Sequence, residues 1–346
     1  MKRNIKSMTL AELEAQTASM GLPSYRAGQI YRWLHRGCTC FDAMSNLPGG
    51  LRETLDREFF ITAPSILQKQ VSAADGTIKY LWELYDGNSV ESVLMEYRHG
   101  NSICVSTQVG CRMGCRFCAS TIGGLVRSLE PSEILDQVLF AQLDSGKKIS
   151  NIVLMGIGEP LDNFDSVLRF LELVNSPEGL NIGMRHISLS TCGLVEEVDK
   201  LADYNLQLTL SVSLHAPDNE TRSKLMPVNR RYDVDTLLSA CERYFRKTGR
   251  RVSFEYSMIR DVNDTDEHAR LLSRKLAGTG SHVNLIRLNH VDERGLEPST
   301  NERVKAFMDI LGRSGINVTL RRRLGSDIDA SCGQLRRKQQ RNRGVL

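Results

Sequence analysis

The sequence has no long apolar run, and no apolar segment directly follows its first three residues. No stretch approaches the roughly 18 consecutive apolar residues that a membrane-spanning helix needs. Met1, Lys2 and Arg3 lead directly into polar residues, without the apolar core of a secretory signal. We therefore expect a cytoplasmic protein without a membrane partner, in which cysteine thiols stay reduced.

The net charge is also small, because 45 Lys and Arg residues and 41 Asp and Glu residues give only +4. So small an excess does not by itself indicate a nucleic-acid-binding protein. Its distribution is more informative. Residues 321–346 hold eight basic and two acidic residues, so this segment carries +6 and residues 1–320 carry −2. Residues 222–251 hold nine basic and three acidic residues, and the two clusters together predict contact with phosphate groups.

Three parts follow one another along the chain. Residues 1–75 are predicted to form a helical module, with a capping box of Thr9 and Glu12 at its start. Residues 76–102 alternate like strands around a turn, and residues 70–76 are the expected linker. From residue 103, strands are predicted near residues 103–108, 151–156, 186–191, 207–214, 251–258, 283–288 and 317–322, and helices near residues 132–144, 163–174, 195–204, 233–247, 264–277 and 300–313. This alternation predicts an α/β fold with a parallel sheet, open or curled into a barrel, and with its chemistry at the carboxyl ends of the strands.

Nine cysteines, an odd number at irregular spacing, argue against a disulfide framework. Cys111, Cys115 and Cys118 follow a predicted strand with C-x3-C-x2-C spacing. Three thiolates can hold three irons of a [4Fe–4S] cluster and leave the fourth iron for a small chelating molecule. S-adenosylmethionine (SAM) offers an amine and a carboxylate for this purpose, and an electron from the cluster can split its sulfonium into a carbon radical.

The alternatives for the triplet are a zinc knuckle and three buried thiols. Structural zinc usually takes four protein ligands, often from paired C-x2-C elements. No second pair and no histidine partner lies nearby in the sequence. The spacing therefore favours an iron–sulfur cluster.

Four segments, together with this triplet, resemble the RlmN/Cfr family of radical-SAM RNA adenine methyltransferases. They are residues 108–111 (QVGC), 155–160 (MGIGEP), 213–215 (SLH) and 327–335 (DIDASCGQL). The resemblance extends over almost the whole chain. It implies a radical-SAM partial (β/α)6 barrel with a small N-terminal helical domain. Residues 1–75 would then contact RNA, and residues 76–102 would connect this module to the barrel. Residues 103–346 would form the barrel and a basic tail.

The resemblance also implies a SAM site at the ends of successive strands. The positions that match the family's SAM contacts are Gly158, Glu159, Ser190, Ser213, Leu214, His215 and Asn289. Glycines allow the backbone to approach a ligand closely, and Glu159 can accept a hydrogen bond from an ammonium group. Without the resemblance, the glycine segment would be an ordinary strand-end turn and His215 a structural histidine.

Three further residues receive catalytic roles from the resemblance. Cys332 matches the cysteine that first accepts a methyl group from SAM, and Cys104 matches the partner that closes a transient disulfide with it. A thiolate attacks a sulfonium methyl readily, whereas an aromatic ring carbon does not. Glu91 matches the family's proton acceptor. From the residues alone, Cys104 would be a buried thiol, Cys332 would be ambiguous and Glu91 would be an exposed strand glutamate. The remaining cysteines, Cys38, Cys40, Cys192 and Cys241, are assigned no chemistry.

The expected reaction is therefore methylation of carbon 2 of adenosine in 23S rRNA and in tRNA, by a monomer that takes electrons from a low-potential donor. The target base would be extruded into the pocket. The alternative within the family is methylation at carbon 8, but residues 118–125 (CASTIGGL) look more like the carbon-2 group. The alternative from another class is a non-catalytic, zinc-stabilised RNA-binding protein.

Overall fold

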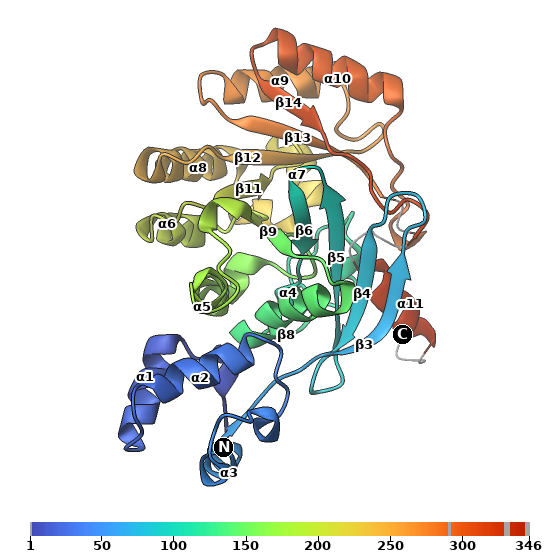
Figure 1. Ribbon diagram of the computed structural model, residues 1–346. Helices are drawn as coiled ribbons and strands as arrows, with labels where there is room; N and C mark the ends of the chain where they lie inside the picture. The colour runs from blue at the N-terminus through green and yellow to red at the C-terminus, as the bar shows by residue number, and fades with distance from the viewer. Residues whose placement is uncertain (1, 290–291, 329–332, 343–346) are drawn as a thin grey trace.

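One ten-stranded sheet organises the chain (Figure 1). The computed structural model describes residues 2–289, 292–328 and 333–342. The order of the strands in the sheet is β14-β13-β12-β11-β10-β9-β6-β5-β4-β3, so the later strands follow one another in chain order. The sheet is parallel from β6 to β14 and antiparallel from β3 to β6.

The parallel half confirms all seven predicted strands from residue 103 onward. They are β6 (Gly100–Cys104), β9 (Ile149–Leu154), β10 (Ile187–Thr191), β11 (Thr209–Ser213), β12 (Ser253–Met258), β13 (His282–Arg287) and β14 (Asn317–Leu320). Most of their apolar side chains are buried, and the register places Ile103 opposite Ile152 and Leu154 opposite Leu189. Apolar and polar residues alternate along β10 and β11, as expected for strands whose two faces have different surroundings.

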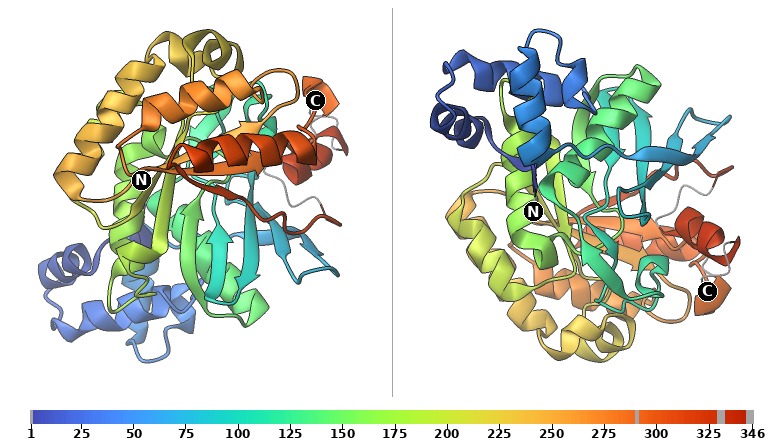
Figure 2. Two further views of the ribbon diagram at one scale, coloured as in Figure 1. Left: turned by 90° about the horizontal axis from the view of Figure 1, so that it is seen from above. Right: turned by 90° about the horizontal axis from the view of Figure 1, so that it is seen from below.

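The six predicted helices of this half are also present. They are α4 (Pro131–Ser145), α5 (Phe164–Asn175), α6 (Val195–Asp203), α8 (Val234–Thr248), α9 (Asp266–Leu276) and α10 (Asn301–Arg313). Helix α4 packs on α5, α6 packs on α8, and α9 packs on α10. Together the helices form a layer beside the curved sheet (Figure 1 and Figure 2). This is the expected α/β fold with an N-terminal helical domain. None of the helices in the described ranges combines the length and the apolar character that a bilayer crossing requires.

The antiparallel half contains one correction. Strands β4 (Ile78–Glu83) and β5 (Ser89–Tyr97) confirm the predicted strand alternation. Residues 70–76, however, are not a linker, because they contain the end of β3 (Ser65–Val71) and the turn into β4. The Ser72 amide donates to the Thr77 carbonyl at 2.8 Å, and Gly76 has a φ of +74°. Small polar residues are common to linkers and hairpin turns, so composition did not distinguish the two.

The N-terminal module is helical, as expected, with α1 (Leu10–Ser19), α2 (Tyr25–Leu34) and α3 (Gly49–Glu58). The capping box is present, since the Glu12 amide donates to Thr9 Oγ1 and the Thr9 amide donates to Glu12 Oε2. A buried ion pair ties the module to the barrel. Lys6 Nζ lies 2.8 Å from Asp136 Oδ1 on α4 and 2.7 Å from the Thr62 carbonyl.

A buried histidine makes this module sensitive to acid. The His35 ring stacks on Tyr31 at 4.1 Å, and neither ring nitrogen has a hydrogen-bond partner among the described residues. Burial, with a smaller effect of Lys6, lowers the pKa of His35 to about 4. Below pH 6.5 the unfolded chain therefore takes up a proton that the folded chain does not bind, and stability falls as the pH decreases toward 4.

We expect the unfolding free energy of the wild type to fall, relative to that of a His35→Phe variant, by about 2 kcal/mol between pH 7 and pH 5. Phenylalanine keeps the stack on Tyr31 but cannot titrate. Urea unfolding of both proteins at the two pH values measures the difference. An equal decline in the two proteins would show that His35 is already protonated in the folded state.

Candidate functional site

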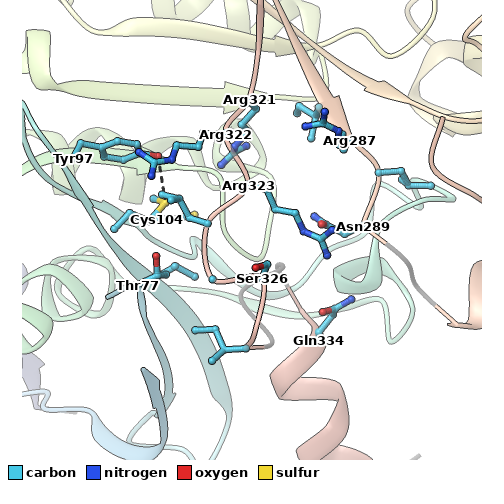
Figure 3. A pocket seen from close by; sticks show the side chains of 17 residues that line it. Thr77, Tyr97, Cys104, Arg287, Asn289, Arg321, Arg322, Arg323, Ser326 and Gln334 are labelled. Carbon is cyan, nitrogen blue, oxygen red and sulfur yellow. Dashed lines mark hydrogen bonds between the residues drawn. The ribbon is translucent and has the colours of Figure 1, made fainter. Parts of the chain in front are cut away.

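Two adjoining cavities lie at the carboxyl ends of the parallel strands, where the chemistry was expected. The first, here called the cysteine pocket, has a volume of about 240 Å³ and is lined by the three cysteines of the triplet. The second, here called the arginine pocket, has a volume of about 290 Å³ and is lined by Arg287, Arg321, Arg322 and Arg323 (Figure 3). Ile286 and Arg321 line both cavities, so the two are neighbours.

The triplet loop is held by backbone hydrogen bonds between β7 (Gln108–Gly110) and β8 (Leu125–Ser128). The Cys111 amide donates to the Gly124 carbonyl at 2.9 Å. Beyond it, Thr121 Oγ1 donates to the carbonyls of Cys115 and Cys118, both at 3.0 Å. Arg294 Nη2 donates to Thr121 Oγ1 at 2.8 Å. The loop therefore presents its three sulfur atoms from a fixed backbone.

Burial makes these thiols hard to ionise on their own. It raises the pKa of Cys111 to about 12 and that of Cys115 well above its usual range, and the neighbouring thiols add to both shifts. Thiolates here therefore require a positively charged partner such as an iron–sulfur core.

The donor set fits a cluster better than a single ion. Among the described residues, no group of three or more His, Cys, Asp or Glu side chains is gathered to hold one metal ion. Each thiolate of a [4Fe–4S] cluster binds a different iron, so the three sulfurs need not converge on one point. The buried Ser120 hydroxyl lines the same pocket and has no hydrogen-bond partner among the described residues, so it is available to a bound ligand.

The glycine segment after β9 is shaped by close backbone contact. A Cβ atom at Gly156 would lie 2.6 Å from the Val105 carbonyl, and one at Gly158 would lie 2.7 Å from the Gln108 Cβ atom. Gly158 also has a φ of +114°, which other residues rarely adopt. Only glycine lets this segment lie against the start of the triplet loop.

Glu159 and Glu255 place two buried carboxylates on the wall of the cysteine pocket. Burial raises the pKa of each group, and hydrogen bonds oppose the shift. Glu159 accepts from the amides of Cys192 and Leu161, while Glu255 accepts from Asn284. Sequence reasoning identified Glu159 but missed Glu255, which lies on β12 between Phe254 and Tyr256.

His215 lines the same pocket and is neutral. Its Nδ1 accepts a hydrogen bond from the Ser257 amide at 2.9 Å, so the proton of the neutral ring lies on Nε2. Burial, with a smaller effect of Arg222, lowers the pKa of His215 to about 3. A φ of +56° and an edge contact with Phe117 fix the ring, which can therefore donate one hydrogen bond from a defined position.

The other predicted SAM contacts are divided between the two cavities. Ser190 and Ser213 line the cysteine pocket with Gly158, Glu159 and His215. The Leu214 side chain is buried in the main apolar core, and its backbone amide donates to the Glu255 carbonyl. Asn289 lines the arginine pocket instead. Cys192, which received no role, lies in the wall of the cysteine pocket.

Most basic residues of the cluster at residues 222–251, for which phosphate contact was predicted, have acidic or backbone partners in the described chain. Arg222 is fully buried and donates to the carbonyls of Leu214, Ser213 and Cys192, so it holds the ends of two strands. Five more basic residues of the cluster form ion pairs with acidic neighbours: Lys224, Arg231, Arg243, Arg246 and Lys247. The acidic partners of three of them lie on α6, outside the cluster, where charge counting over a window did not include them.

Glu91 on β5 is buried, which excludes the exposed strand glutamate. Its carboxylate lies 2.7 Å from Lys79 Nζ, and both residues are almost fully buried. It also accepts from the Gly333 amide at 2.7 Å and the Arg336 amide at 2.6 Å, at the start of α11 (Gln334–Asn342). Glu91 thus anchors the last described helix and lines neither pocket.

Of the two cysteines with expected redox roles, only Cys104 lies within the described residues. Cys104, at the end of β6, is buried beside Val93 and Met95 and lines the arginine pocket. Cys332 lies outside the described residues. Its neighbour Gly333 packs so closely on Ser120 that a Cβ atom would lie 2.9 Å from the serine hydroxyl, and Ser120 lines the cysteine pocket.

Comparisons with known proteins agree with this geometry. A family model of the radical SAM superfamily matches residues 105–272, and a model of the ribosomal RNA large subunit methyltransferase N-terminal domain matches residues 3–61. A protein of Clostridium tetani named probable dual-specificity RNA methyltransferase RlmN is 50% identical over 98% of this chain and 97% of its own length. A protein of Pelotomaculum thermopropionicum with the same name is 54% identical over 97% of this chain and 92% of its own length.

A solved structure extends the agreement to three dimensions. The crystal structure of a radical SAM methyltransferase from Sphaerobacter thermophilus has a TM-score of 0.91 and 43% identity, and the match covers 96% of this chain and 98% of that chain. Similarity at this level covers both the N-terminal module and the barrel. The chain therefore belongs to the RlmN family of radical-SAM RNA methyltransferases, enzymes that use a [4Fe–4S] cluster and SAM.

Proposed function

We propose that this chain methylates carbon 2 of adenosine in 23S rRNA and in tRNA. The observation that carries the proposal is the pairing of a cysteine pocket with an adjoining arginine pocket in a chain that is 50% identical to a probable dual-specificity RNA methyltransferase. An iron–sulfur radical enzyme needs the first cavity, and an anionic polymer substrate needs the second.

Cys111, Cys115 and Cys118 are the residues that would hold the cluster, which when bound supplies the electron that splits the sulfonium of SAM. The buried carboxylates of Glu159 and Glu255 suit a ligand with a sulfonium and an ammonium group, because buried charges need partners. The other residues proposed to surround SAM are Gly158, Ser190, Ser213, His215, the backbone of Leu214 and, from the arginine pocket, Asn289.

Two cysteines carry the methyl group in this proposal. The Cys332 thiolate takes a methyl from SAM, and the RNA becomes bonded to the same sulfur through that carbon. The Cys104 thiolate then attacks the sulfur and forms a disulfide. The electron pair of the broken sulfur–carbon bond stays with the carbon, and a proton added there completes the methyl group. The position of Cys104 in the wall of the arginine pocket supports this role.

The proton acceptor in this proposal is Glu91. Lys79 and two amides at the start of α11 occupy its oxygens. Oε1 carries one of these three bonds, from the Arg336 amide, so it is the oxygen proposed to take the proton.

Mass mapping of the product tests the proposal. Holoenzyme, SAM and a low-potential reductant are incubated with rRNA and tRNA from cells that lack this activity, and the digested nucleosides are compared with 2-methyladenosine and 8-methyladenosine standards. We expect 2-methyladenosine in both RNAs, and none with Cys332→Ala protein that retains iron and sulfide. The 8-methyl product would favour the alternative reaction, and stoichiometric zinc without iron would overturn the enzyme assignment.

A further inference from the structure

The arginine pocket has a one-sided charge. Arg287, Arg321, Arg322 and Arg323 line it, and none of the described residues in its wall is acidic. Arg287 ends β13, and the three consecutive arginines follow β14, so two neighbouring strand ends bring four arginines to the wall of one hollow (Figure 3). Arg287 also donates to the neutral Asn301 side chain at 3.1 Å, so its positive charge is not cancelled there. Such a concentration of positive charge in a cavity favours an anionic ligand.

Two of these arginines have no partner among the described residues. Arg322 and Arg323 are exposed, and neither side chain forms a hydrogen bond or an ion pair with any described residue. The contrast with the basic cluster is clear, because Arg243 and Lys247 there bind Asp199 and Asp203. Unpaired guanidinium groups at a cavity are available for phosphate oxygens, which they can bind through two parallel hydrogen bonds.

The floor of the same pocket is apolar. Val93, Met95, Leu288 and Leu324 line it, and Cys104 lies among them. A cavity with an apolar floor and a cationic rim is complementary to a nucleotide, whose base is flat and apolar on its faces and whose phosphates are charged. The base would then enter beside Cys104, and the phosphates would stay at the rim.

We propose that Arg287, Arg322 and Arg323 form a phosphate clamp that binds the backbone phosphates on both sides of the target nucleotide. This inference rests on the proposed function, which supplies RNA as the ligand. Extruding a base from its stack costs free energy, and backbone contacts fix the register of the strand while the base turns inward. Arg321, which lines both cavities, stays at the passage between the clamp and the cysteine pocket.

The salt dependence of RNA binding tests the clamp, because each lost phosphate contact reduces the release of counterions. The probe is a synthetic RNA stem–loop with an unpaired adenosine, titrated with holoenzyme and followed by fluorescence anisotropy. For the double variant Arg322→Ala/Arg323→Ala, the slope of log Kd against log salt should fall by about 1.4, at about 0.7 per single-stranded contact. The affinity ratio between wild type and variant should therefore narrow about sevenfold between 50 and 200 mM salt.

Matched variants separate the clamp from general effects. Arg274→Ala/Arg313→Ala removes two exposed arginines of α9 and α10 and should keep the wild-type slope. Arg322→Lys/Arg323→Lys should also keep the slope, because counterion release depends on charge. The loss in the alanine variant should be equal for a stem–loop with uridine in place of the adenosine, since phosphate contacts carry no base information.

The outcomes distinguish the two proposals. Wild-type holoenzyme that does not bind the stem–loop would overturn both the proposed function and the clamp. Wild-type binding with an unchanged slope in Arg322→Ala/Arg323→Ala would overturn the clamp alone. A lysine variant that loses the slope as the alanine variant does would also overturn it.

Discussion

Replacing Cys104 by alanine should leave the protein covalently attached to its RNA. In the proposed reaction the methyl carbon joins the Cys332 sulfur to the nucleotide, and only a second thiol in reach can break that bond by forming a disulfide. Cys104 lies in the wall of the pocket that is complementary to a nucleotide. The variant should therefore release no methylated RNA, and the adduct should survive a denaturing gel and appear by mass spectrometry as protein plus nucleotide after ribonuclease digestion.

Cys241→Ala is the matched control, because this thiol lies on the buried face of α8 in the apolar core and has no proposed chemistry. It should turn over like the wild type. The double variant Cys104→Ala/Cys332→Ala should form no adduct, since the attachment point is removed. Clean release of methylated RNA by Cys104→Ala would remove Cys104 from the reaction.

Lys79→Met should destabilise the protein by about 3–5 kcal/mol, the usual cost of leaving one partner of a buried ion pair without its counter-charge. Lys79 and Glu91 are both almost fully buried and lie 2.7 Å apart. Without the ammonium group, the Glu91 carboxylate keeps two amides at the start of α11 but loses its cation. Urea unfolding of anaerobically purified protein measures the change.

Lys69→Met is the matched control on the adjoining strand. Lys69 pairs with Asp144, but about a third of its side chain is exposed, so the loss should be within about 1 kcal/mol. Adding Glu91→Gln to Lys79→Met should recover part of the stability, because no uncompensated charge then remains. A Lys79→Met protein as stable as the Lys69→Met protein would show that the buried pair contributes little.

The features that the sequence predicted well are local in the chain. The triplet spacing, the glycine segment and the strand–helix alternation each depend on residues within about one turn or one strand. The missed elements have weak local patterns: α7 (Asn219–Leu225) is short and polar, and β3 is an exposed edge strand. Neither contains the apolar run or stripe from which elements are identified.

The burial of Glu91 and Arg222 could not be predicted from the sequence for a different reason. Glu91 and Arg336 are 245 positions apart in the chain, yet a hydrogen bond joins the Glu91 carboxylate to the Arg336 amide. A glutamate on a strand is exposed unless such partners arrive from elsewhere, and no window of sequence contains them. The same holds for Arg222, whose burial depends on carbonyls from two strand ends.

The buried pair of Lys6 and Asp136 has a consequence for the shape of RNA that the enzyme accepts. Together with the bonds from Asn4 to Glu130 and Ser132, it fixes the N-terminal module on α4 and leaves no hinge at that junction. The distance between the module and the arginine pocket is then fixed. If RNA contacts both the module and the pocket, as we propose, it must present its target loop at that separation, and we expect unrelated sequences that fold to the same spacing to be accepted.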